Sequence, residues 1–143
     1  MHMNTKTLLA ALAAGVASFL MGWIVYGMAL MSYMNEHTTR AAMKIMRPEP
    51  EFLYLILGSL AAGLWMAWIL QRMGVNSLKG GLVTGAIMAG LIALNYDLMF
   101  HALMAMYKGR MMLLVDVAAS AVIGGVVGVV AGAVLGTGQK AAA

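Results

Sequence analysis

Four long runs of apolar residues dominate the chain, and short polar segments separate them. The runs cover residues 7–34, 52–71, 80–107 and 111–136. Each is long enough for an α-helix that crosses the hydrocarbon core of a bilayer, which needs about 20 apolar residues. The runs lack the two-residue alternation of a membrane β-barrel. The pattern therefore predicts an all-α fold over residues 1–143, a single membrane domain with four transmembrane helices packed as an antiparallel bundle.

The first and second runs are joined by the longest polar segment, NEHTTRAAMKIMRPEPE, in which apolar and basic residues interleave. Thr38 or Thr39 is placed to cap a short helix through Met46, since a threonine hydroxyl accepts a hydrogen bond from a free helix N–H group. A short helix of this composition is typical of a segment that lies in the membrane interface. Two interpretations follow: a solvated, partly helical linker, or a lid over the mouth of the bundle with Glu36 and His37 facing inward.

The fourth run carries glycines at a spacing of four, which places them on one ridge of a helix: Gly124, Gly128, Gly132 and Gly136. A ridge without side chains lets a second backbone approach closely, as in GxxxG motifs. We predict that this ridge packs inside the bundle. A homodimer through glycine-rich faces is the second use that the pattern allows.

Composition strengthens the membrane interpretation. Hydrophobic residues make up 63% of the chain and charged residues only 10%, whereas a soluble domain carries about 25% charged residues. Membrane lipids are therefore the expected surroundings. The net charge of +4 lies mostly at the ends of the runs, which indicates contact with lipid headgroups and not with nucleic acid. The chain has no cysteine, which excludes disulfides and thiolate chemistry.

Basic residues near the ends of the runs bear on orientation. Four lie on one side of the predicted membrane (Lys6, Arg72, Lys79 and Lys140) and five on the other (Arg40, Lys44, Arg47, Lys108 and Arg110). Four spans place both termini on the same side. We predict the cytoplasmic side, because three of the five belong to the expected interfacial helix and weigh less under the positive-inside rule. Residues 1–2 and 141–143 resemble cloning remnants, so His2 is excluded from the candidate site.

Two acids and a histidine interrupt the third and fourth runs: Asp97, His101 and Asp116. Asp97 and His101 are four residues apart and share one helix face. His101 precedes Gly109 by eight residues and Asp116 follows it by seven. At about 1.5 Å per residue, both lie roughly 10–12 Å below the tight turn expected at Lys108-Gly109-Arg110, so a pair between them is geometrically reasonable. Asp97 is expected about one turn deeper.

These polar residues, with others near the same end, form the set of ligand- or proton-binding candidates: Asp97, His101, Asp116, Tyr26, Asn95, Glu36 and His37. Ionisable groups at membrane depth are costly and often mark a pathway for a proton or substrate. We therefore predict an integral membrane protein that handles a proton or a small polar or cationic ligand near one membrane face. The alternative is a structural or accessory membrane subunit whose buried Asp/His network only fixes helix packing.

An enzymatic interpretation would use His101 with Asp116 or Asp97 as a general acid–base pair. No nucleophile motif, metal-ligand spacing or nucleotide-binding loop accompanies that pair, so we predict no catalytic residue and no cofactor. The chain has 16 methionines, and Met28, Met31 and Met34 recur at a spacing of three. Thioethers bind Cu(I), but methionine is also a flexible apolar filler in helices. We interpret the stripe as packing and predict no metal site.

Four short stretches carry a resemblance to a known group of proteins: GWIVYG at 22–27, KGGLVTGAI at 79–87, NYDL at 95–98 and VDVAAS at 115–120. They resemble a family of small bacterial four-helix membrane proteins that has no assigned activity. The resemblance implies a four-helix fold in the bacterial inner membrane. It transfers no catalytic residue.

Overall fold

The computed structural model describes residues 4–138, and within that range the chain is helical with no strand. The suggested cloning remnants at both ends, and His2 with them, lie outside the described residues. The elements are α1 (Thr5–Gly22), the π-helix η1 (Trp23–Ala29), α2 (Met31–His37), α3 (Arg40–Ile45), α4 (Phe52–Arg72), α5 (Leu78–Leu103) and α6 (Met111–Gly136). The predicted all-α class is confirmed.

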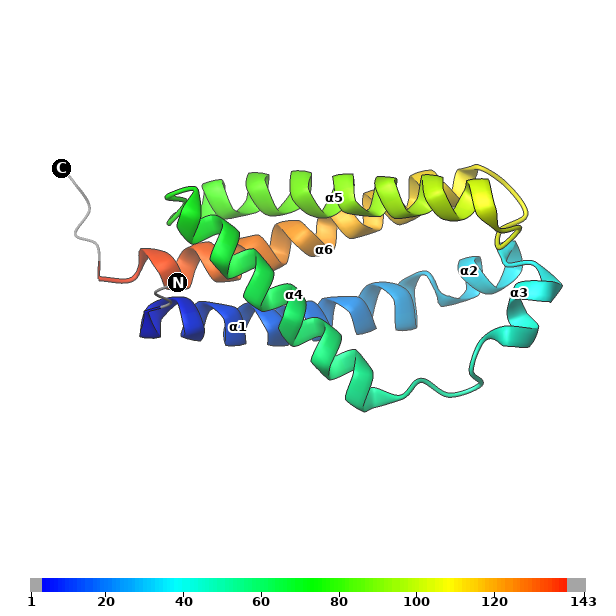
Figure 1. Cartoon of the computed structure of the whole chain (residues 1–143), viewed down its shortest axis with the longest axis horizontal. Coiled ribbons are helices and arrows are strands. Elements are labelled where there is room, and N and C mark those ends of the chain that lie inside the picture. The colour runs from blue at the N-terminus through cyan, green and yellow to red at the C-terminus, as the bar shows by residue number, and fades with distance from the viewer. Residues whose placement is uncertain (1–3, 139–143) are drawn as a thin grey trace.

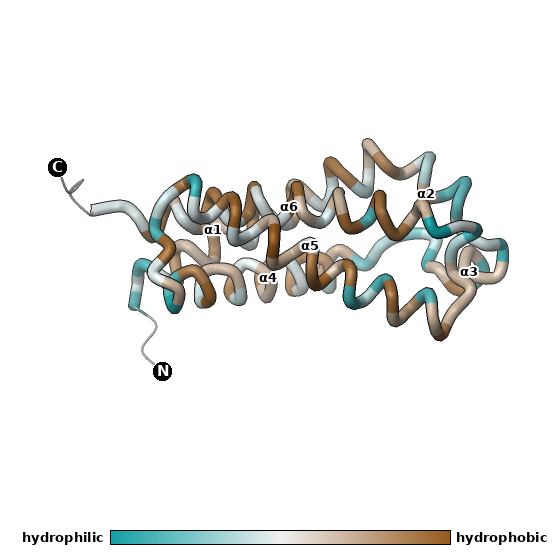
Figure 2. The backbone as a smooth tube through the Cα atoms, turned by 90° about the horizontal axis from the view of Figure 1, so that it is seen from above, coloured by the Kyte–Doolittle hydropathy of each residue, from teal (hydrophilic) through white to brown (hydrophobic). Residues whose placement is uncertain are grey.

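Among the described residues, four segments are long and apolar enough to cross a membrane: Thr5–Ala29, Phe52–Arg72, Leu78–Leu103 and Met111–Gly136. They overlap the four predicted runs and are consistent with an integral membrane protein. Hydrophobic residues predominate along these helices, and hydrophilic residues gather toward the two ends (Figure 2).

The boundaries of two helices differ from the sequence pattern. The third run predicts a helix to residue 107, but α5 ends at Leu103 because Met104 adopts an extended conformation. The first run predicts a continuous α-helix, but a π-helical segment interrupts it, in which the Leu30 amide donates to the Val25 carbonyl at 2.8 Å. Both changes leave the apolar pattern intact, so the pattern alone does not reveal them.

A core of small and apolar side chains joins three helices at the end of the molecule where both termini lie (Figure 1). α1 supplies Ala10, Ala11 and Ala14, α4 supplies Met66, Ala67 and Leu70, and α6 supplies Val127, Ala131 and Leu135. From this core α4 runs diagonally away from α5 (Figure 1). α4 therefore separates from α5 and α6 toward the end of the molecule away from this core (Figure 1).

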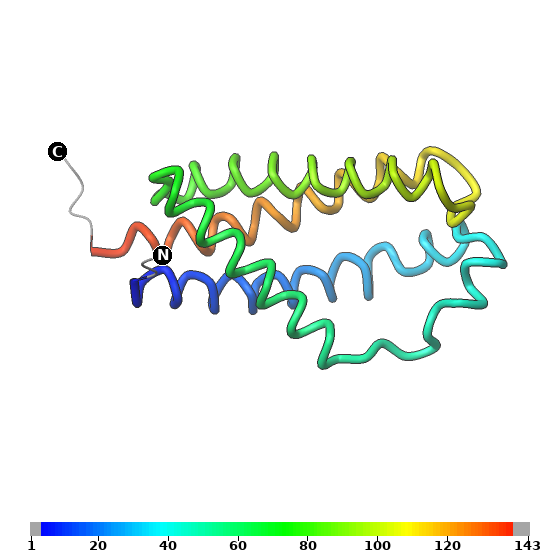
Figure 3. The backbone as a smooth tube through the Cα atoms, in the orientation of Figure 1, coloured from blue at the N-terminus to red at the C-terminus, as the bar shows by residue number. Residues whose placement is uncertain are grey.

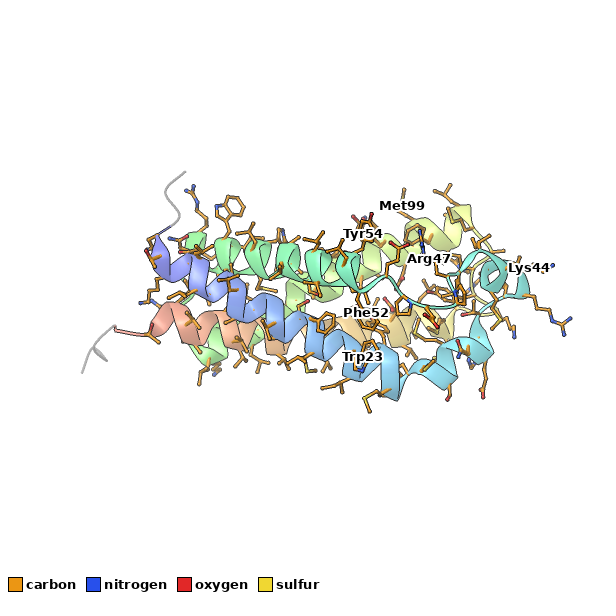
Figure 4. The ribbon with its side chains drawn as sticks, turned by 90° about the horizontal axis from the view of Figure 1, so that it is seen from below. Trp23, Lys44, Arg47, Phe52, Tyr54 and Met99 are labelled. Atoms are coloured by element: carbon orange, nitrogen blue, oxygen red, sulfur yellow. The ribbon has the colours of Figure 1, made fainter. Side chains whose placement is uncertain are left out.

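The start of α4 has few neighbours. Every residue from Phe52 to Gly58 is exposed in the isolated chain. The ring of Phe52 packs on that of Trp23, with 5.5 Å between centroids, and both are labelled in Figure 4. The connection before α4 loops outward before it returns to Phe52 (Figure 3). In it, Arg47 and Glu51 form an exposed ion pair.

α5 and α6 touch backbone to backbone through glycines. A Cβ added at Gly128 would overlap the carbonyl oxygen of Gly81, and one added at Gly85 would overlap that of Gly124. A Cβ added at Gly132 or Gly136 would likewise overlap a carbonyl oxygen of the turn before α5. The ridge of α6 is therefore covered by α5 and its preceding turn. α1 and α4 make a similar contact, in which a Cβ on Gly63 would overlap the backbone of α1.

The glycine contact gives a stability prediction. Gly128→Leu places a branched side chain where the α5 backbone lies, so the free energy of unfolding should fall by about 3 kcal/mol or more. Gly58→Leu is the matched control, because nothing lies within 4 Å of a Cβ at that glycine. Thermal melting of the detergent-solubilised protein checks both variants. Equal melting temperatures for the two leucine variants would show that the ridge is not a packing surface.

Candidate functional site

A cavity of about 770 Å³ lies where the helices separate. Its walls come from α1, η1, α4, α5 and α6 and from the loop between the last two. Its volume falls within the range of about 300–1,000 Å³ that is typical of small-molecule pockets. Most of the wall is apolar. The polar side chains that line it are Ser18, Tyr26, Ser59, Tyr96, Asp97, Tyr107, Asp116 and Ser120.

One side of the cavity holds a hydrogen-bonded group that joins η1 to α6. The Tyr26 hydroxyl donates to Asp116 Oδ1 at 2.9 Å and lies 3.1 Å from Ser120 Oγ. Asp116 and Ser120 are four residues apart on α6, so they share one face. Tyr26 lies within the π-helical turn, and such turns occur frequently at functional sites. The local break in the first span is therefore located at a cavity residue.

Asp97 lies opposite this group, on α5. Only 8% of its surface is exposed, and its Oδ2 makes no hydrogen bond to any described residue. Its carboxyl group lies within direct interaction range of that of Asp116. A buried polar atom without a partner costs about 1–3 kcal/mol. Asp97 is therefore a lining residue of the cavity whose buried Oδ2 the described residues leave without a hydrogen-bond donor.

The predicted pairing of His101 with Asp116 is wrong. His101 is exposed on α5 and does not line the cavity. The reason is the early end of α5, because a seven-residue loop over 104–110 replaces the expected tight turn. Counted from the helix ends, Asp97 precedes Leu103 by six residues and Asp116 follows Met111 by five. The acid on α5, and not the histidine, consequently faces Asp116.

The remaining candidates lie outside the cavity. Asn95 is exposed on α5, and Glu36 is exposed near the end of α2. His37 stacks on Tyr33 with 4.1 Å between ring centroids, and its Nδ1 lies 2.8 Å from the Tyr33 carbonyl oxygen. Neither Glu36 nor His37 lines the cavity. The interpretation of a lid with these two side chains facing inward is therefore wrong.

The segment after α2 is tied to the α5–α6 loop by the hydrogen bonds that we call the clasp. Thr39 donates from its amide to Met106 O at 2.9 Å and from its hydroxyl to Ala105 O at 2.8 Å. The Lys108 amide donates to His37 O at 2.8 Å. Met106 and Tyr107, which lie within the clasp, line the cavity. The clasp therefore holds one wall of the cavity in place. Figure 3 shows the segment after α2 beside the α5–α6 loop.

Thr39 also begins α3, since its side chain accepts a hydrogen bond from the Ala42 amide at 3.3 Å. The predicted threonine cap is confirmed at Thr39, and α3 ends at Ile45, one residue before the expected end.

Several cavity residues were not among the candidates. Ser120 was detectable from its spacing of four after Asp116. Tyr107 was not, because the sequence predicts a helix through that position and the loop conformation brings it to the cavity. Burial raises the pKa of Tyr107, and the nearby charges of Asp116 and Asp97 raise it further. The phenol therefore stays protonated and remains a hydrogen-bond donor beside the two acids.

Comparison with protein-family models finds no match for this chain. Comparison with curated proteins and with solved structures finds none either. The interpretation of the cavity consequently depends on its own chemistry.

The Tyr26–Asp116 hydrogen bond gives a second stability prediction. Tyr26→Phe removes a hydroxyl that donates to a carboxyl group, so the free energy of unfolding should fall by about 1–3 kcal/mol. Tyr54→Phe is the control, because Tyr54 is 67% exposed on α4 and lies outside the cavity. Unfolding in mixed micelles of increasing denaturing detergent measures both. If the Tyr26 variant were as stable as the control variant, the hydrogen bond would not hold η1 against α6.

Proposed function

We propose that this chain is an integral membrane protein, an antiparallel four-helix bundle that binds a proton or a small polar or cationic ligand between Asp97 and Asp116. One observation carries the proposal. The buried Asp97 Oδ2 has no hydrogen-bond partner among the described residues, and its carboxyl group lies near that of Asp116 beside a cavity of about 770 Å³.

The charge of the site supports a positively charged occupant. Two carboxyl groups at close range in a medium of low dielectric constant repel each other strongly when both are ionised. No lysine, arginine or histidine is among the described residues that line the cavity. A proton or a cation between the acids relieves the repulsion. Ionisable residues inside membrane spans often mark the route of an ion or a substrate.

The alternative is a structural or accessory subunit, and the exposed start of α4 favours it. The side chains from Phe52 to Leu57 cover little of the rest of the chain, and a partner helix would bury them. Gly58 has open space above its Cα, so a glycine-containing face is left for a homodimer after α6 has packed on α5. Membrane lipids cover the same surface in a monomer. Most buried polar atoms in a purely structural network are hydrogen-bonded, however, so the unpaired Asp97 Oδ2 favours a ligand.

The placement in the membrane belongs to the same proposal. α3 lies in the interface at the clasp end, and the opposite end carries both termini on the cytoplasmic side of a bacterial inner membrane. The resemblance to small bacterial four-helix proteins supports the bacterial membrane. Lys44, labelled in Figure 4, supplies positive charge for lipid headgroups at the clasp end.

Proton handling is testable by flux through reconstituted protein. Proteoliposomes that contain a pH-sensitive dye should dissipate an imposed pH gradient faster than empty liposomes. Asp97→Asn should reduce the protein-dependent rate about tenfold or more, because it removes the buried acid without changing its size. Glu49→Gln is the matched control, since it removes an exposed carboxyl group outside the cavity.

Folding of each variant is checked by gel filtration before reconstitution. A wild-type rate equal to that of empty liposomes would favour the accessory role over proton handling. An Asp97→Asn rate equal to that of the wild type would place proton handling elsewhere in the chain.

A further inference from the structure

The cavity is larger than its acids require. A proton or a bare metal ion between Asp97 and Asp116 occupies only a small part of about 770 Å³. Among residues 4–138 there is also no group of three or more His, Cys, Asp or Glu side chains that could hold a metal ion. The remaining space is walled mainly by apolar side chains, which water solvates poorly. The cavity therefore suits an occupant with a positive group and an apolar body.

Aromatic side chains form much of the apolar wall. Five of them line the cavity, from η1, α4, α5 and the clasp: Tyr26, Trp65, Tyr96, Phe100 and Tyr107. Aromatic rings attract cations through their negative faces, and aromatic cages are a recurring means of recognising ammonium groups. The same rings also pack against apolar ligand groups. Tyr96 and Phe100 are 59% and 42% exposed in the isolated chain, so other residues leave part of each uncovered.

The hydrogen bonds of the two acids indicate the kind of cation. Asp116 Oδ1 already accepts from the Tyr26 hydroxyl. Asp97 is more than nine-tenths buried, and its Oδ2 has no donor among the described residues. An ammonium group that carries an N–H bond supplies both the positive charge and the hydrogen-bond donor that Asp97 lacks. A quaternary ammonium or a phosphonium ion supplies only the charge.

We propose that the ligand of this cavity is a protonated organic amine with an aromatic or aliphatic body, whose N–H donates to the Asp97 carboxyl group and whose body contacts the aromatic wall. The inference rests on the proposed function, because it names the ligand class of the same site. It excludes a dedicated metal site and a route for protons alone.

Two probes of the same shape separate charge from apolar fit. Dibenzylamine is protonated at neutral pH and has two rings, and 1,3-diphenylpropane is its uncharged carbon isostere. Each is titrated into the full-length protein in detergent, and the indole N–H signal of Trp65 is followed by NMR. Trp68 on the same helix does not line the cavity, so its indole signal controls for changes in the micelle.

The amine should shift the Trp65 signal saturably and bind about tenfold or more tightly than the isostere, because only the amine forms a charge-assisted hydrogen bond. Asp97→Asn should weaken amine binding by about the same factor and leave the isostere unchanged. Glu49→Gln should change neither. If Asp97→Asn does not fold, the affinities of the two probes for the wild-type protein still test whether the cavity selects a protonated amine.

Equal affinity for the two probes would overturn the inference, since the cavity would then select only for apolar shape. No saturable change at Trp65 with dibenzylamine would overturn it as well. Proton flux that depends on Asp97, without amine binding, would support the proposed function and contradict only the amine as its ligand. If the wild-type protein showed neither proton flux nor amine binding, both the proposed function and the amine ligand would be contradicted.

Discussion

The backbone contact between α5 and α6 is the constraint on which the site depends. Gly81 meets Gly128 and Gly85 meets Gly124 with no side chain between the helices. Because a Cβ at any of these positions would overlap the other backbone, the contact fixes both the distance and the sliding position of the two helices. The tight core at the same end adds α1 and α4 to this pair. Rigid packing there leaves the opposite end free to hold a cavity.

The glycine contact also decides which polar groups meet. Measured from the contact of Gly85 with Gly124, Asp97 lies twelve residues along α5 and Asp116 eight residues along α6. The four-residue difference amounts to about 6 Å along the helix axis, which two carboxyl side chains can span. His101 differs from Asp116 by eight residues, about 12 Å. The π-helix then brings Tyr26 to Asp116 from the other side, and the clasp adds Tyr107.

Much of this arrangement follows from the sequence, and the rest does not for identifiable reasons. Continuous apolar runs predict four spans, and a threonine before a short amphipathic stretch predicts the Thr39 cap. The acids were recognisable because charge is rare in an apolar run. The proximity of Asp97 to Asp116 was not recognisable. The end of α5 at Leu103 depends on the extended conformation of Met104 and on hydrogen bonds to a segment about 70 residues earlier. The π-helix leaves no mark in the apolar pattern.

The alignment of α5 with α6 is the central claim, and the absence of cysteine from the chain allows a direct measurement. Asp97→Cys/Asp116→Cys and His101→Cys/Asp116→Cys are each treated in membranes with a short bifunctional thiol reagent. The loop over 104–110 is then cut at an inserted protease site, and a denaturing gel shows whether the two halves stay joined. The alignment described above predicts efficient linkage for the Asp97 pair and little for the His101 pair. Preferential linkage of the His101 pair would contradict the alignment and the two-acid site built on it.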